Sequence, residues 1–417
     1  MTKPASAGIF YGWWIVGAAF LNLFCAVGII YYGFPVFYPA FVTSLGFTRA
    51  EVTQGFLLGF LVIGLPFGLL AGVLIDRIGT RWVILSGVGL VGLPLIGMGF
   101  MNHFWQYQLL CIFEVIGYTL AGPIANQVLV AHWFHTQRGR AMGYAYLGLG
   151  LGGAVSPPTM NWLLHHFGWR HALEMVGATI LLVLFPTGFW VTHSKPADLG
   201  LYPDGALVPV PREVHTAADL STLGAMKVAF KDKNFWLLVA GSALVIGALN
   251  AVIQHFIFFL ISRGYTSASA SRYLSMLLIA SLGGRVVVGY IADRFKRKNT
   301  MAGFYFLLGA AIPLLYLAHQ PLIAATFALL FGFSMGADYM LIPLVTAECF
   351  GVASLGKILA LVIMGYSIGQ WIGPWVAGRI FDAHHSYDPA WKVMSIAALL
   401  GSVAIYSISK KPVVIAE

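Results

Sequence analysis

The sequence predicts an all-α membrane protein with twelve transmembrane helices. Of the 417 residues, 59% are hydrophobic and only 9% are charged, whereas a soluble domain carries about 25% charged residues. The apolar residues fall into runs of about 20 or more, the length that an α-helix needs to cross a bilayer. Runs this long without alternation exclude a β-barrel, so we expect helices, which satisfy their own backbone hydrogen bonds in lipid.

Six of the predicted helices lie before a long polar segment. We expect them over residues 12–42, 51–75, 81–101, 104–134, 139–166 and 170–193. Basic residues mark several of the turns between them: Arg49 follows the first run, Arg77 the second and Arg138 the fourth. The next apolar run begins only at residue 234, and the intervening residues 194–233 hold several prolines and lysines. We therefore expect this segment to be a linker loop.

The other six helices follow the linker. We expect them over residues 234–262, 268–294, 300–318, 321–350, 356–384 and 389–410. A basic cluster from Arg294 to Lys298 separates the second of these runs from the third. The sequence thus predicts an N-terminal six-helix bundle over residues 1–193, a linker over 194–233 and a C-terminal six-helix bundle over 234–417.

The charges in the turns predict the orientation of the chain. If the N-terminus lies inside, 17 of the 24 Lys and Arg residues fall in inside segments, six fall in outside segments and Arg285 lies within a helix. The inside residues are Lys3, Arg77, Arg81, Arg138, Arg140, Lys195, Arg212, Lys227, Lys231, Lys233, Arg294, Lys296, Arg297, Lys298, Lys357, Lys410 and Lys411. Basic residues favour the cytoplasmic side. We therefore expect a multi-pass protein of a bacterial inner membrane with both termini in the cytoplasm, and the net charge of +9 reflects topology rather than nucleic-acid binding.

The sequence offers no motif for catalysis or for a cofactor. It contains no His-Glu-x-x-His, nucleophile elbow or Walker loop, so we expect neither an enzyme nor an ATP-driven pump. The run Gly148-x-Gly150-x-x-Gly153 matches a dinucleotide fingerprint, but it lies inside an apolar run, where small residues allow close helix packing. The three cysteines lack metal-site or disulfide spacing. We expect no cofactor and no metal.

A short motif recurs in the two halves of the chain. Gly72-x-x-x-Asp76-Arg77 follows the second predicted helix, and Gly289-x-x-x-Asp293-Arg294 follows the eighth. Internal repeats of this kind are typical of transporters whose site lies between the halves near the bilayer midplane. With this repeat the whole chain resembles the major facilitator superfamily. The resemblance implies two six-helix bundles around a central cavity, and a gating role for Asp76, Arg77, Asp293 and Arg294 on one face.

A narrower resemblance involves the first and fifth predicted helices. Tyr11-Gly12-Trp13-Trp14 opens the first, and Trp133-Phe134-x-x-x-Arg138-Gly139-x-Ala141-x-Gly143 opens the fifth. These segments are similar to the two signatures of monocarboxylate transporters and their bacterial relatives. Parts of the pattern are shared with other carboxylate carriers, including the oxalate–formate type. The resemblance implies transport of an anionic carboxylate.

Arg285 is the basic residue that topology does not explain. It lies eight residues before Asp293, roughly 12 Å from the cytoplasmic end of its helix and close to the middle of a core about 30 Å thick. A charge at that depth costs at least about 2.5–3.5 kcal/mol and must face a cavity or a partner. A guanidinium binds a carboxylate through two parallel hydrogen bonds. We expect Arg285 to bind the substrate carboxylate, as the resemblance also implies; the alternative is an ion pair with Asp338.

Several polar and aromatic residues at similar depth complete the candidate site. Tyrosine hydroxyls could share the carboxylate, while Leu147 could contact a short carbon tail. Each of these residues alone more often serves helix packing than substrate binding, and Tyr118 is the candidate that we favour. The substrate-binding candidates besides Arg285 are Tyr32, Tyr118, Leu147, Asn250, Gln254, Tyr339, Tyr366 and Gln370.

Three titratable residues inside apolar runs are candidates for proton coupling. Asp338 and Glu114 are carboxylic acids, and burial favours the protonated form of such groups. His255 titrates near neutral pH in water. Alternatively, Glu114 is a packing residue and His255 a polar residue near the outer surface. In the animal transporters a helix 1 lysine and a helix 8 acid are implicated in coupling. The matching positions here, Val36 and Ser281, carry no charge.

The sequence therefore predicts a secondary transporter that carries a short monocarboxylate, such as lactate or pyruvate, by alternating access and with a proton. An organic-anion exchanger of the oxalate–formate type is the first alternative, and a carboxylate sensor that does not transport is the second. The expected partners are a small organic anion, a proton and the lipid bilayer, without nucleic acid, and we expect the protein to be monomeric.

Overall fold

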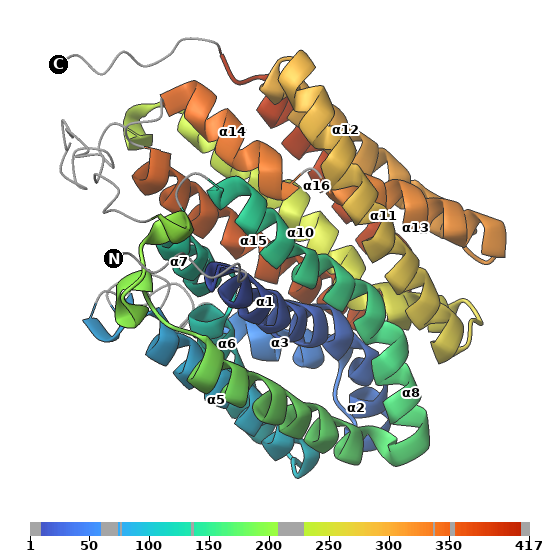
Figure 1. Ribbon diagram of the computed structural model, residues 1–417. Helices are drawn as coiled ribbons and strands as arrows, with labels where there is room; N and C mark the ends of the chain where they lie inside the picture. Colours follow the sequence, from blue (N-terminus) through green and yellow to red (C-terminus); the bar gives the residue numbers. More distant parts are fainter. Residues whose placement is uncertain are drawn as a thin grey trace, which may run out of the picture. The chain divides into compact units, whose positions relative to one another are not determined.

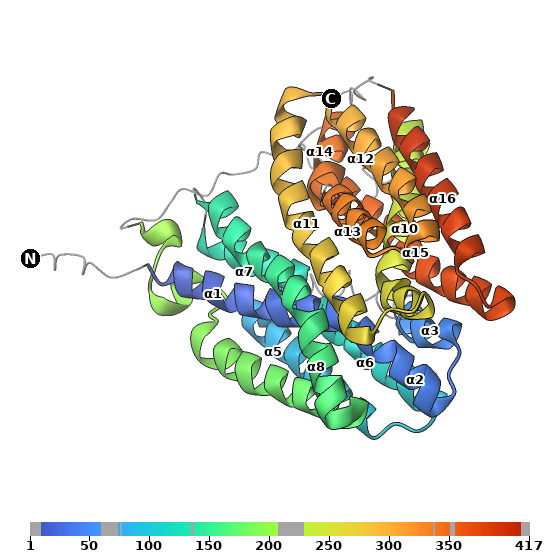
Figure 2. The ribbon, with the colours of Figure 1, turned by 90° about the vertical axis from the view of Figure 1, so that its right-hand side faces the viewer.

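The structure is a computed structural model that describes residues 10–59, 74–75, 77–134, 137–206, 229–336, 338–350 and 355–409. These residues form helices and turns, with no strand among them, which confirms the all-α prediction (Figures 1 and 2). Each of the twelve predicted ranges contains helix. Seven described helical segments are long and apolar enough to cross a membrane. The total of twelve spanning helices stays a prediction.

The chain forms two compact units, and each is built from three separate segments of the sequence. Unit 1 comprises Met1–Gly33, Leu58–Ser156 and Leu163–Glu213. Unit 2 comprises Phe34–Leu57, Pro157–Trp162 and Val214–Glu417. Unit 2 therefore includes parts of the predicted N-terminal half. The predicted linker falls partly on residues 207–228, which lie outside the described part of the chain, and the boundaries at 193 and 234 stay predictions.

Unit 1 is built mainly from the first predicted bundle. Helix α1 continues through the π-helix η1, α5 lies against α6, and α1 lies against α7 (Figure 1). The helices are α1 (Gly12–Leu23), η1 (Phe24–Gly33), α5 (Thr80–Gly99), α6 (Phe104–Ala121), α7 (Pro123–Trp133), most of α8 (Arg138–Pro186) and η4 (Thr187–Val191). Gly168 has φ 73° inside α8, a left-handed value that favours glycine. The predicted fifth and sixth helices therefore join at Gly168.

Helix α10 is the most completely buried long helix of unit 2. Helix α10 packs against α15 and α16, α11 against α13, and α12 against α16 (Figures 1 and 2). Every residue of α10 from 245 to 260 is buried, including the polar residues Asn250, Gln254 and His255. The other helices are α2 (Tyr38–Leu45), α3 (Arg49–Gly59), α10 (Lys233–Ser262), α11 (Ser267–Arg294), α12 (Arg297–Ala311), α13 (Pro321–Met335), α14 (Asp338–Phe350), α15 (Leu355–His384) and α16 (Asp388–Tyr406).

Glycines on α8 allow its close contact with α1 and η1 inside unit 1. A Cβ atom added to Gly148 would lie 2.2 Å from the backbone oxygen of Phe20. One added to Gly152 would lie 2.5 Å from the backbone oxygen of Phe24. The Gly148-x-Gly150-x-x-Gly153 run is thus in the middle of a helix. It lacks the strand–turn–helix setting that a dinucleotide fingerprint requires, and its glycines serve helix packing.

Arg49 and four residues around it connect the start of α3 to distant parts of unit 2. Its guanidinium carbon lies 3.5 Å from the ring centre of Phe381, 4.7 Å from that of Phe258 and 5.1 Å from that of Tyr387. The Asp382 carboxylate accepts the backbone N–H groups of Arg49 at 3.2 Å and Ala50 at 3.0 Å. This Arg49 cluster (Arg49, Phe258, Phe381, Asp382 and Tyr387) satisfies two N–H groups at a helix start. Arg49, which the sequence analysis placed in a turn, therefore packs against residues of distant helices.

Replacing Asp382 by alanine is expected to lower the free energy of unfolding by about 0.5–2 kcal/mol, the usual cost of losing a side chain that caps a helix N-terminus. The N–H groups of Arg49 and Ala50 would lose their acceptor. Thermal unfolding in detergent measures the effect. His384→Ala is the control, because His384 is exposed on the same helix. Equal melting temperatures for the two variants would contradict this role of Asp382.

Candidate functional site

Arg285 lies where α11 passes close to the junction of α13 and α14. A Cβ atom added to Gly284 would be 2.0 Å from the backbone oxygen of Phe333, and one added to Gly336 would be 2.6 Å from the backbone nitrogen of Arg285. These glycines bring the helix backbones together. The Arg285 side chain is half-buried. Its guanidinium acts electrostatically on the carboxyl of Asp338, the first residue of α14. The structure therefore places Arg285, which is predicted to bind the anion, beside Asp338, which is predicted to bind the proton.

A buried polar cluster surrounds Asp338 in unit 2. Ser242 on α10, Tyr305 on α12 and Asp338 on α14 are exposed by 0%, 1% and 6%. The Tyr305 hydroxyl lies near both the Ser242 hydroxyl and the Asp338 carboxyl. The Ser242 hydroxyl, the Tyr305 hydroxyl and Oδ1 of Asp338 nevertheless have no hydrogen-bond partner among the described residues. Most buried polar groups are hydrogen-bonded, so this cluster (Ser242, Tyr305, Asp338) has unused hydrogen-bonding capacity.

Tyr366 and Gln370 lie on the neighbouring helix α15. Tyr366 is close enough to act electrostatically on Tyr305, and Gln370 is half-buried one turn further along. Of the predicted site residues, the structure therefore brings Arg285, Asp338 and Tyr366 together around the polar cluster. Ser242 and Tyr305 are the members that the sequence did not single out.

Three predicted residues on α10 make contacts within unit 2. The Asn250 amide donates to the backbone oxygen of Ile246 at 2.8 Å, and the Tyr38 hydroxyl donates to Oε1 of Gln254 at 3.2 Å. His255 is fully buried; its Nδ1 lies 3.0 Å from the Tyr387 hydroxyl and its Nε2 lies 2.8 Å from the backbone oxygen of Pro374. These contacts favour a structural task for His255. Its role in proton coupling stays a prediction.

Of the predicted residues of unit 1, Tyr32 lies on η1, Glu114 and Tyr118 on α6, and Leu147 on α8. Tyr31 stacks on Tyr118 with ring centres 6.4 Å apart, and it meets Tyr32 edge-on at 5.0 Å. Leu147 on α8 is 46% exposed. Glu114 on α6 is fully buried, and neither of its carboxyl oxygens has a hydrogen-bond partner among the described residues. Their roles in substrate binding and proton coupling stay predictions.

The gating candidates are only partly described. Asp76 lies outside the described residues, and nothing is described of the side chains of Asp293 and Tyr339. Arg77 and Arg294 are exposed. Their gating role stays a prediction.

Arg77 lines an open cavity of about 590 Å³ in unit 1 together with Arg81, Lys195 and Asp198. His193 also lines this cavity. Burial, and then the nearby Arg81, lower the pKa of His193, so its ring is neutral near pH 7. The cavity therefore owes its positive character to the arginines and the lysine.

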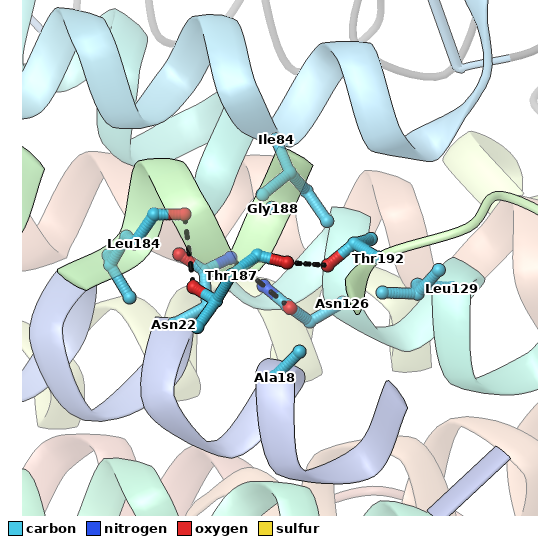
Figure 3. A pocket seen from close by; sticks show the side chains of 9 residues that line it. All are labelled: Ala18, Asn22, Ile84, Asn126, Leu129, Leu184, Thr187, Gly188 and Thr192. Atoms are coloured by element: carbon cyan, nitrogen blue, oxygen red, sulfur yellow. Dashed lines mark hydrogen bonds between the residues drawn. The ribbon is translucent and has the colours of Figure 1, made fainter. Parts of the chain in front are cut away.

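A second cavity in unit 1 is too small for an organic anion. It measures about 10 Å³ and is lined by nine residues of α1, α5, α7, α8 and the segment that follows α8 (Figure 3). Asn22 donates to the backbone oxygen of Ala121 at 2.8 Å and to Oδ1 of Asn126 at 3.2 Å. Oδ1 of Asn22 is buried without a hydrogen-bond partner among the described residues. This volume is near the minimum of about 10–15 Å³ that a cavity needs to hold one water molecule, so the cavity suits a structural water.

Comparison with known proteins gives one family and a consistent fold. The family model described as Major Facilitator Superfamily matches residues 19–344. The transporter pytF of Aspergillus terreus is 28% identical over 296 residues, which are 70% of this chain and 92% of that protein. Monocarboxylate transporter 13 of Bos taurus is 26% identical over 407 residues, covering 96% of this chain and 89% of the relative. Human monocarboxylate transporter 12 is 22% identical over 429 residues, covering 97% and 81%.

Solved structures resemble the chain in fold. A variant of the nucleoside transporter NupG matches with a TM-score of 0.76 and 14% identity, over 96% of this chain and 100% of that chain. A bacterial homolog of the human lysosomal transporter Spinster, in an inward-facing conformation, matches with a TM-score of 0.67 and 16% identity, over 98% and 95% of the two chains.

Proposed function

Because the chain belongs to the Major Facilitator Superfamily, we propose that this membrane transporter carries a short monocarboxylate of the lactate or pyruvate kind by alternating access. It is a transporter and not an enzyme. Its substrate is a small molecule, and relatives named monocarboxylate transporters align over almost the whole chain. The names of these relatives support monocarboxylates as the substrate class. Their sequences are 22% and 26% identical to this chain.

Arg285 carries the proposal. It is a half-buried cation deep in α11 that acts on the carboxyl of Asp338, and the Tyr305 hydroxyl lies near that carboxyl. A guanidinium with hydroxyl groups nearby matches a carboxylate that bears a hydroxyl or keto group. One cation suits one negative charge, which favours a monocarboxylate over a dicarboxylate. We further propose that both termini face the cytoplasm of a bacterial cell, in agreement with the distribution of basic residues.

The function is tested by uptake of labelled lactate, pyruvate, formate and oxalate into proteoliposomes. We expect saturable uptake of lactate or pyruvate, with faster uptake when an inward proton gradient is imposed. Empty liposomes, and liposomes with heat-denatured protein, measure leakage of the protonated acids. Uptake of oxalate only in exchange for internal formate would replace symport with anion exchange. The absence of saturable uptake of every acid would contradict carboxylate transport.

A further inference from the structure

We propose that Asp338, in the cluster with Tyr305 and Ser242, is the group that takes up one proton when an anion binds at Arg285. This inference rests on the proposed function and assigns the coupled proton to the Asp338 carboxyl. Three observations carry it: the hydrogen bonds that the polar cluster leaves unmade, the position of Arg285, and the absence of a carboxylate at position 281.

The first observation is the unused hydrogen-bonding capacity of the cluster. A cluster that only stabilises a fold has satisfied hydrogen bonds, because each unsatisfied buried polar group costs about 1–3 kcal/mol. Here the Tyr305 hydroxyl lies near the Ser242 hydroxyl and near the Asp338 carboxyl, yet neither hydroxyl nor Oδ1 of Asp338 has a hydrogen-bond partner among the described residues. Such an arrangement can accept a proton or a water molecule with little rearrangement. A hydroxyl can donate to an ionised carboxylate and accept from a protonated one, so Tyr305 fits both states of Asp338.

The second observation is that Arg285 and Asp338 act on each other. The guanidinium favours the ionised form of the carboxyl. A substrate anion at Arg285 offsets this positive charge, so Asp338 then binds a proton more readily. Linkage is reciprocal, and a proton on Asp338 must therefore favour anion binding to the same extent. In the step itself, the Asp338 carboxylate takes a proton from a hydronium ion, an O–H bond forms and water leaves. Anion and proton together add no net charge to the site.

Among the described residues, the groups that act on Asp338 or on its neighbour Tyr305 come from several helices. Ser242 belongs to α10, Arg285 to α11, Tyr305 to α12 and Tyr366 to α15. Of these, Arg285 is the charged one, so the linkage depends mainly on it.

The third observation is that helix α11 itself offers no acid one turn before Arg285. Ser281 occupies that position and donates its hydroxyl to the backbone oxygen of Leu278 at 2.7 Å. His255 is less suited, because both of its ring nitrogens are already engaged by Tyr387 and Pro374. Asp338 therefore provides the nearby carboxyl group that the sequence of α11 lacks.

Titration calorimetry of the full-length protein with L-lactate, in buffers of different ionisation enthalpy, counts the protons taken up per anion. We expect a count approaching one for the wild type over part of the pH range. In that range Kd rises by about tenfold per pH unit, the limit for one linked proton. For Asp338→Asn we expect binding with a proton count near zero and a Kd independent of pH. Glu348→Gln is the matched control, because Glu348 is an exposed acid on the same helix, and it should behave as the wild type.

Tyr305→Phe provides the second variant, in case Asp338→Asn does not fold. Removing the hydroxyl that can donate to the ionised carboxyl favours its protonated form. We therefore expect the pH dependence of Kd to move to higher pH while the proton count is retained. An unchanged proton count in folded Asp338→Asn, loss of lactate binding in that variant, or an unshifted Tyr305→Phe profile would each overturn the assignment.

Failure of the inference can be separated from failure of the proposed function. If the wild type binds lactate without proton uptake, the inference is wrong and carboxylate binding stands. If the wild type binds none of the monocarboxylates, the proposed function is wrong. Infrared pH-difference spectra of the lactate-free protein then decide the proton site: a carboxyl band present in the wild type and Glu348→Gln but missing in Asp338→Asn supports Asp338. The same band in all three proteins overturns it.

Discussion

Replacing Arg285 by glutamine is expected to abolish measurable binding and uptake of lactate. Glutamine keeps a polar side chain but removes the charge and the paired N–H groups that grip a carboxylate. Truncating one partner of a buried charge pair costs about 2–5 kcal/mol, so Kd should rise at least about 30-fold. Calorimetry with lactate and uptake into proteoliposomes provide the two measurements.

Arg272→Gln is the matched control for this substitution. Arg272 lies on the same helix α11, but its side chain is exposed and donates to the Ser269 hydroxyl at 3.1 Å. The control should leave Kd and uptake within about twofold of the wild type, as is usual for exposed charges. Arg285→Lys should recover only part of the affinity, because an ammonium group cannot form the planar two-bond contact. Wild-type uptake by Arg285→Gln would remove Arg285 from the site.

Gly148 lies where α8 packs closely against α1. Gly148→Val is expected to prevent correct packing of α8 against α1, because even the Cβ atom would lie 2.2 Å from the backbone oxygen of Phe20. Overpacking a core costs about 1–3 kcal/mol when side chains can adjust, and a backbone oxygen on a helix adjusts less. We expect a large loss of monodisperse protein in size-exclusion chromatography and a lower melting temperature for what remains.

Gly143→Val tests whether this effect depends on the contact or on valine in a helix. Gly143 lies on the same helix α8, is exposed, and a Cβ atom there would meet nothing within 4 Å. This variant should give the wild-type yield and melting temperature. Equal damage from both substitutions would show that the close approach of α8 to α1 is not what Gly148 provides.

The helices and the family could be predicted from the sequence because their signals are local. Apolar runs and turns predicted helix over all twelve ranges, and the repeated Gly-x-x-x-Asp-Arg motif predicted the superfamily that the family model identifies. Arg285 was conspicuous because a charge deep in an apolar run is costly. Asp338 was conspicuous for the same reason.

The rest of the site could not be predicted because it depends on contacts between helices distant in sequence. Tyr305 and Ser242 are ordinary polar residues in apolar runs, and only the packing of α10, α12 and α14 places Tyr305 near both Ser242 and Asp338. Gln254 was expected to bind substrate, and in the structure it accepts a hydrogen bond from Tyr38. Whether it also contacts an anion stays a prediction.

The Arg49 cluster also has a consequence for the synthesis of the protein. Arg49 and the Asp382 carboxylate are separated by 333 residues, and Phe381 and Tyr387 are equally late in the chain. At about 5–20 residues per second, roughly 15–70 s of translation separate the first helices from their final partners. During that interval the nascent chain must keep Arg49 in water or against lipid headgroups. The cap of α3 therefore forms only after α15 has been made. A chain that stops before α15 would leave the N–H groups of Arg49 and Ala50 without the Asp382 carboxylate.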